Sequence, residues 1–132
     1  MPINHLFQKK ETIGHVLFVD DSAVLLRTVK GFVPPKYKVS LATNAEQAFK
    51  VINQSAPDLI FLDYEMPDIN GAQLLARIRS NPELGHIPVV FLSSNPLERH
   101  LGEIMDLNPA GYILKPPVAD RIIGVIEKYL EK

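Results

Sequence analysis

Four short apolar segments of this sequence each run directly into residues whose side chains can do chemistry. The residues that follow them are Asp20 and Asp21, then Asp63, Ser93 and Lys115. Three carboxylates brought together repel one another, which favours the binding of a hard divalent cation such as Mg²⁺. The metal and the lysine together would balance a phosphoryl group. One carboxylate would then be free to act as a nucleophile and form an acyl phosphate.

The segments that must position these side chains alternate between two patterns. Apolar or alternating runs typical of strands cover residues 16–19, 37–41, 59–62, 89–92 and 112–114. Residues at helical spacing mark helices over 24–32, 45–52, 74–78, 96–106 and 119–130. This alternation predicts an α/β fold of five units, (βα)5, in an open, doubly wound parallel sheet with helices on both faces. Five units are too few to close an eight-stranded barrel.

The order of the strands decides whether the chemical residues meet. We expect the flavodoxin-like order 2-1-3-4-5, in which the second strand is an edge and the other four are neighbours. The second strand ends in Ala42 and Thr43, neither of which is ionisable. Ligands of open α/β sheets bind outside the carboxyl ends of the strands. The four chemical strand ends would therefore face one crevice.

Local signals give further expectations about the helices. Ser22 and Asn44 are expected to be N-caps, and Pro96 to be the first residue of its helix. The core-facing residues of the first helix are expected to be Val24, Leu25, Thr28, Val29 and Phe32. Those of the fourth helix are expected to be Leu97, Leu101, Ile104 and Met105. The histidines share no ligand spacing and are expected to be solvated or to cap helices: His5, His15, His86 and His100.

Composition limits the class of protein. The chain has 132 residues, 46% of them hydrophobic and 22% charged, which predicts one globular domain. We expect an N-terminal arm over residues 1–14 and the domain over 15–132. A net charge of −1 disfavours direct nucleic-acid binding, and the lack of cysteine excludes disulfides and thiolate metal sites. No apolar run approaches the roughly 18 residues of a membrane span, and we expect a cytoplasmic protein.

The strand-end residues and the segment after the third strand resemble a known family, the receiver domain of two-component response regulators, including those of chemotaxis. The resemblance covers roughly residues 14–131 and rests on four features in order: the pair Asp20-Asp21, the run DYEMPDINGAQLL from residue 63, Ser93, and the pair Lys115-Pro116. Each feature alone is common. Their combination, each placed at a strand end, is highly specific.

The resemblance implies a role for each matching residue. Asp63 would accept the phosphoryl group, Ser93 would bond it and Lys115 would pair with it. Ser93 and Tyr112 would change arrangement on activation, and the Lys115–Pro116 bond would be cis. The resemblance also implies a Mg²⁺ site whose ligands would be Asp20, Asp21, Asp63 and the backbone carbonyl of Glu65.

The same resemblance implies a signalling switch rather than an enzyme acting on other substrates. A sensor histidine kinase or phosphotransfer protein would supply the phosphoryl group, and the protein would catalyse its own phosphotransfer and dephosphorylation. The face made by the fourth helix, fifth strand and fifth helix would contact an output partner that the sequence does not identify, or a second copy in a homodimer. Glu98, Arg99 and Glu103 are expected to contribute specificity on that face.

Three other classes of protein would require different residues at these positions. An FMN carrier of the same strand order would need a phosphate-binding loop after the first strand, where Asp20 and Asp21 would repel phosphate. A phosphatase with an aspartate nucleophile needs an acid two residues after that nucleophile, which Asp20-Asp21-Ser22 does not supply. A receiver-like interaction module that is not phosphorylated would predict loss of the acceptor, the acid pair or the lysine. None of these is lost, and this module remains the alternative.

Overall fold

The computed structural model describes residues 12–131 and has five parallel strands in the order β2-β1-β3-β4-β5. The expected α/β class and strand order are therefore confirmed. The strands are β1 (His15–Val19), β2 (Lys38–Ala42), β3 (Leu59–Asp63), β4 (Val89–Ser93) and β5 (Gly111–Leu114). The helices are α2 (Ala23–Phe32), α3 (Ala45–Gln54), α4 (Gly71–Arg79), α5 (Leu97–Ile104), the 3₁₀ turn η1 (Met105–Leu107) and α6 (Ala119–Leu130). The predicted arm over 1–14 and His5 lie almost wholly outside the described residues.

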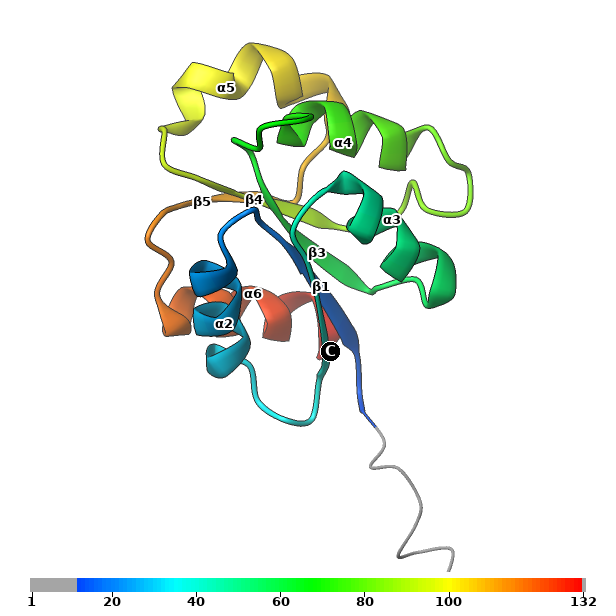
Figure 1. The fold of residues 1–132 in the computed structure, drawn as a ribbon, viewed down its shortest axis with the longest axis vertical. Helices are drawn as coiled ribbons and strands as arrows, with labels where there is room; N and C mark the ends of the chain where they lie inside the picture. The colour runs from blue at the N-terminus through cyan, green and yellow to red at the C-terminus, as the bar shows by residue number, and fades with distance from the viewer. Residues whose placement is uncertain (1–11, 132) are drawn as a thin grey trace, which may run out of the picture.

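Helices cover both faces of the sheet, as the apolar strands require. Helices α3, α4 and α5 lie on one face and α2 and α6 on the other (Figure 1). Strands β1, β3 and β4 are buried along their whole length, while β2 at the edge is only partly covered. Within residues 12–131, no helix has both the length and the apolar character needed to cross a membrane.

The register of the sheet brings the strand ends to one level. Val19 pairs with Leu62, and Asp63 pairs with Leu92, in parallel ladders. Ser93 pairs with Leu114 in the next ladder. The residues that follow these positions therefore leave the sheet at the same edge, as parallel strands dictate.

Capping residues fix where the helices that leave this edge begin. Ser22 Oγ accepts from Leu25 N at 3.1 Å and Asn44 Oδ1 accepts from Gln47 N at 2.8 Å, so both expected N-caps are confirmed. The prediction for Pro96 is off by one residue. Its ψ of 155° is extended, which makes Pro96 the N-cap and leaves Leu97 as the first helical residue.

The face that α5 turns to the core differs from the predicted stripe. The core-facing residues of α5 are His100 and Ile104. Three of the four predicted residues are exposed: Leu97 by 39%, Leu101 by 44% and Met105 by 63%. The orientation of the helix places the His100 ring on that of Tyr64, with centroids 3.6 Å apart. A similar difference occurs in α2, where Leu26 is buried and Val24 is exposed.

A glycine allows α4 to start close against the end of β3. Gly71 N donates to Tyr64 O at 2.8 Å. A Cβ at Gly71 would lie 2.9 Å from Asp63 O, Tyr64 Cα and a ring carbon of Phe91. Only glycine fits this approach without displacing the loop that follows Asp63.

Candidate functional site

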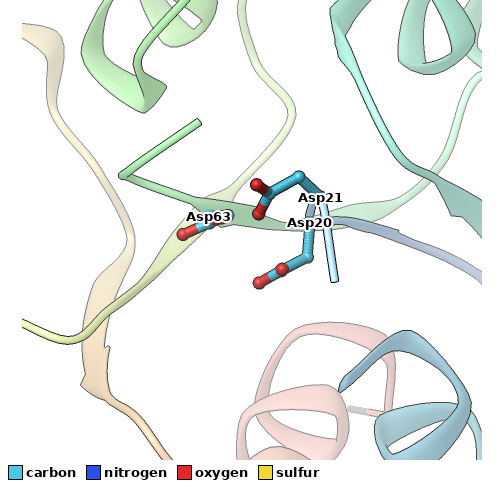
Figure 2. A group of neighbouring side chains, drawn as sticks. All are labelled: Asp20, Asp21 and Asp63. Atoms are coloured by element: carbon cyan, nitrogen blue, oxygen red, sulfur yellow. The ribbon is translucent and has the colours of Figure 1, made fainter. Parts of the chain in front are cut away.

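Three carboxylates meet at the carboxyl ends of β1 and β3, as the sequence predicted. Asp20 and Asp21 follow β1 and Asp63 is the last residue of β3. One carboxylate oxygen from each lies within 4.8 Å of the others (Figure 2). Asp20 and Asp63 are fully buried and Asp21 is exposed. The cluster therefore has two buried members and is open to solvent at Asp21.

Lys115, which follows β5, reaches across the sheet edge to two of these carboxylates. Its Nζ lies 2.8 Å from Asp20 Oδ2 and 2.9 Å from Asp63 Oδ1. Burial would lower the pKa of Lys115, but hydrogen bonds to Asp20 and Asp63 and their charges raise it above its usual value. The Lys115–Pro116 peptide bond is cis, as the resemblance implied.

The surroundings of the Asp63 carboxyl disfavour its ionised form. Burial raises the pKa of Asp63 to about 7, and the charge of Asp20 adds to the rise, while Lys115 opposes it. Its Oδ2 is buried and has no hydrogen-bond partner among the described residues. A carboxylate oxygen left without a partner in a buried site is costly unless something binds it. A hard divalent cation would satisfy it, so the donor set fits Mg²⁺.

Ser93 lies next to this cluster, but its hydroxyl is engaged elsewhere. Ser93 is the last residue of β4 and is fully buried. Its Oγ donates to Glu65 Oε2 at 2.6 Å and accepts from Asn95 N at 3.0 Å. The predicted neighbours are thus brought together, but Ser93 makes its hydrogen bond to Glu65 and not to Asp63.

The resemblance implies a role for the backbone carbonyl of Glu65, and the side chain of this residue has a separate set of contacts. The carboxylate accepts hydrogen bonds from Ser93 Oγ, Ser94 N, Asn95 Nδ2 and His100 Nε2. Burial opposes ionisation of Glu65, but these hydrogen bonds together hold its pKa below the usual value. The role of the carbonyl as a metal ligand stays a prediction.

The expectation that every histidine is solvated or capping is wrong for two of them. His100 is 8% exposed, stacks on Tyr64 and donates from Nε2 to Glu65 Oε2 at 2.9 Å. His15 is 7% exposed in β1, with Nε2 2.7 Å from Ser40 Oγ. His86 is exposed, as expected. A polar residue one helical turn before the buried Ile104 was the available signal for His100.

Tyr112 lies in β5 and is half-buried. Its hydroxyl donates to the backbone carbonyl of Asn95 at 2.7 Å. Asn95 also donates to Glu65, so one residue of the β4–α5 loop links the tyrosine to the carboxylate. The two residues predicted to change on activation, Ser93 and Tyr112, are therefore joined through the same loop.

Comparison with known proteins agrees with this geometry. Residues 16–127 match the model of the response regulator receiver domain. The chain is 34% identical over 104 residues to the two-component response regulator ORR8 of Oryza sativa subsp. indica, covering 77% of this chain and 86% of that protein. It is 33% identical over 103 residues to a probable cyclic di-GMP phosphodiesterase of Vibrio cholerae, covering 76% of this chain and 23% of that protein. This chain thus corresponds to less than a quarter of the latter.

Solved structures share the fold over most of both chains. The chemotaxis protein CheY4 of Vibrio cholerae superposes with a TM-score of 0.81 at 21% identity, covering 89% of this chain and 98% of that one. The Mn²⁺-bound response regulator Rcp1 superposes with a TM-score of 0.74 at 25% identity, covering 90% and 96%. The residues matched by the family model span most of the chain and include the acidic cluster and Lys115. The strand order agrees with the fold of the superposed structures. The protein belongs to the receiver-domain family of two-component response regulators.

Proposed function

We propose that this receiver domain is a signalling switch phosphorylated on Asp63. The observation that carries the proposal is the Asp63 carboxylate itself. It is fully buried, it has one oxygen on Lys115 and the other without a partner in the described structure, and it lies beside Asp20 and Asp21. Such a group can both hold a cation and attack phosphorus.

In the proposed reaction, a carboxylate oxygen of Asp63 forms a bond to the phosphorus of a phosphohistidine. The phosphorus–nitrogen bond breaks, and its electron pair stays on the imidazole nitrogen. Lys115, whose Nζ lies 2.9 Å from Asp63 Oδ1, would balance charge on the phosphoryl oxygens. In dephosphorylation, a water oxygen attacks the phosphorus, the bond to Asp63 breaks, and inorganic phosphate leaves. The domain would thus catalyse its own phosphotransfer and dephosphorylation.

The residues that would hold Mg²⁺ are Asp20, Asp21, Asp63 and the backbone carbonyl of Glu65. When bound, Mg²⁺ would supply positive charge that stabilises the ionised Asp63 and the phosphoryl oxygens. The fit is supported by the three oxygens within 4.8 Å of one another and by the Mn²⁺ in Rcp1.

A sensor histidine kinase or a phosphotransfer protein would supply the phosphoryl group, in the cytoplasm. The sensor histidine kinase TmoS of Ectopseudomonas mendocina is 29% identical to this chain over 101 residues. The match covers 76% of this chain and 10% of that kinase. The kinase that serves this chain would recognise the edge of the sheet that carries Asp63.

The face built from α5, β5 and α6 is proposed to contact an output partner or a second copy of the chain. Leu97, Leu101 and Met105 form an exposed apolar row at every fourth position of α5 and η1. Leu114 and Val118 are also exposed, by 54% and 61%. Glu98 and Arg99 are exposed beside the row, and Glu103 additionally accepts a hydrogen bond from the Tyr64 hydroxyl.

Intact-mass measurement tests the phosphorylation directly. Incubation with Mg²⁺ and phosphoramidate should add one phosphoryl group, and EDTA should prevent it. Asp63→Asn should remain unlabelled, while Asp68→Asn, an exposed aspartate of the same loop, should label like the wild type. Labelling of Asp63→Asn to the wild-type extent would refute the assignment and favour the alternative of an unphosphorylated interaction module.

The switch itself is tested by amide chemical shifts recorded with Mg²⁺ before and after addition of beryllofluoride. Residues 93–112 should move between two discrete arrangements, because Ser93 can reach the new acceptor oxygens only if its loop moves. Changes confined to residues 20–22 and 63–70 would show a phosphoryl site without a switch behind it.

A further inference from the structure

The Glu65 carboxylate holds the β4–α5 loop through contacts that the proposed phosphoryl chemistry does not use. Glu65 is two residues beyond Asp63, so one short loop carries both carboxylates. Its oxygens accept from four donors in the segment 93–100: Ser93 Oγ at 2.6 Å, His100 Nε2 at 2.9 Å, and Ser94 N and Asn95 Nδ2 at 3.2 Å each. Hydrogen bonds to an ionised acceptor are the stronger kind.

The hydroxyl of Ser93 cannot serve two acceptors at once. A serine hydroxyl has a single proton to donate. Here that proton goes to Glu65, and the Ser93 oxygen already accepts from Asn95 N at 3.0 Å. A phosphoryl group on Asp63 could receive the Ser93 proton only after the Glu65–Ser93 hydrogen bond has broken. Glu65 and the phosphoryl group therefore compete for one donor.

The hydrogen bonds of Glu65 also connect the loop after Ser93 to α5 and β5. His100, which donates to Glu65, is fixed on its ring face by Tyr64 at a centroid distance of 3.6 Å. Asn95, which also donates to Glu65, accepts at its backbone carbonyl from the Tyr112 hydroxyl. Breaking the Glu65 contacts would therefore loosen the loop that ties α5 to β5.

We propose that the Glu65 side chain is a positioning residue that acts through Ser93, keeping the β4–α5 loop in the arrangement of the unphosphorylated protein and lowering the affinity of the site for a phosphoryl group. The inference rests on the proposed phosphorylation of Asp63. Without the Glu65 carboxylate, the Ser93 proton is free and the phosphorylated arrangement is easier to reach. A larger fraction of the protein would then adopt that arrangement before any phosphoryl group binds.

The test is a double-mutant cycle on the affinity of the full chain for beryllofluoride with Mg²⁺, followed by amide chemical shifts. The proteins are wild type, Glu65→Ala, Ser93→Ala and the double variant. Glu65→Ala should bind the mimic about three- to tenfold more tightly, as expected for the loss of one competing hydrogen bond. In the Ser93→Ala background the same substitution should change the affinity by less than about twofold, because the residue through which Glu65 acts is gone.

Further variants separate this role from charge and from folding. Glu65→Gln keeps an acceptor oxygen for Ser93, so its affinity should lie between those of wild type and Glu65→Ala. Glu83→Gln removes one exposed charge between α4 and β4 without touching Ser93 and should bind like wild type. In Glu65→Ala without the mimic, the amide signals of residues 94 and 95 should move part of the way toward their mimic-bound positions.

The outcomes distinguish the two proposals. If wild type binds beryllofluoride no better than Asp63→Asn does, the proposed function fails and this inference fails with it. If wild type binds but Glu65→Ala binds equally or more weakly, the inference is overturned and the proposed function stands. An equal gain in affinity with and without Ser93 would also overturn it, because the effect would then be that of charge alone.

Discussion

The Lys115 side and the Ser93 side of the site differ in their contacts with Asp63, the residue proposed to accept a phosphoryl group. Lys115 already lies 2.9 Å from Asp63 and 2.8 Å from Asp20. Ser93, at the end of the neighbouring strand, donates to Glu65 instead. On one side of the site the lysine already contacts Asp63, and on the other the serine hydroxyl is engaged by Glu65.

The difference has an electrostatic origin. Asp20 and Asp63 are buried and both contact Lys115 Nζ, so the ammonium is required to balance buried negative charge in this arrangement. A neutral hydroxyl has no such requirement and can exchange one acceptor for another at a cost of about 1 kcal/mol. The ammonium therefore suits a permanent part of the site, and the hydroxyl suits the part that is proposed to move.

The largest expected effect is on the free energy of unfolding, which should fall more on loss of the Lys115 side chain than on loss of the Ser93 hydroxyl. Lys115→Ala leaves Asp20 and Asp63 without a cation between them, and should lower the free energy of unfolding at pH 8 in EDTA by about 3 kcal/mol. Ser93→Ala should lower it by about 1 kcal/mol, because Glu65 keeps its other donors. Urea unfolding measures both, with the exposed Lys128→Ala as the matched control. Equal losses for the two variants would contradict the stated difference between the Lys115 side and the Ser93 side.

Replacing either buried aspartate should have a smaller effect on the free energy of unfolding, and of opposite sign. Asp63→Asn or Asp20→Asn should raise the free energy of unfolding in EDTA by about 1 kcal/mol or more, because repulsion between carboxylates is relieved. Urea unfolding in EDTA gives this difference, with the exposed Asp68→Asn as control. Mg²⁺ should stabilise wild type by mass action and these variants less. Asn variants that unfold at lower urea than wild type would contradict the clustering.

The gain for Asp63→Asn should also depend on pH. Burial in the folded protein raises the pKa of Asp63 from 3.8 to about 7. The folded state therefore binds this proton more tightly than the unfolded state, and wild-type stability falls as pH rises through that range. The advantage of Asp63→Asn in EDTA should be larger at pH 8 than at pH 5. Unfolding curves at the two pH values measure it, and an advantage that shrinks toward pH 8 would argue against the raised pKa.

The smallest expected effect lies on the Ser93 side alone. Tyr112→Phe removes the hydrogen bond to Asn95 O and should lower the free energy of unfolding by about 1 kcal/mol or less. Its amide shift changes should stay within residues 93–112 and spare residues 20–22 and 63, because the Lys115 side is held independently. Tyr129→Phe, whose hydroxyl lies 3.5 Å from Ala110 O, is the matched control. Changes that spread to Asp63 would show that the two sides are coupled without phosphorylation.

The architecture was predictable because it depends on repeated local patterns. Buried apolar strands alternate with amphipathic helices, and parallel strands bring their carboxyl ends to one edge. The convergence of Asp20, Asp63 and Lys115 follows from that geometry together with the strand order 2-1-3-4-5, which was expected from the fold class and is confirmed by the structure. The N-caps Ser22 and Asn44 were predictable for the same reason, since each contacts a residue three positions away.

The sheet, the edge at which the ionisable residues gather and the residue types found there could all be predicted from the residue pattern. The hydrogen bond from Ser93 to Glu65, the inward position of His100 and the outward position of Leu97 depend on contacts made in the folded protein. Ser93 and His100 are 28 and 35 residues from Glu65, and the rotation of α5 depends on how the His100 ring packs on Tyr64. Hydrophobic periodicity favours the most apolar stripe of a helix. Here the stacking and hydrogen bonds of one histidine outweigh it, and no local pattern encodes those contacts.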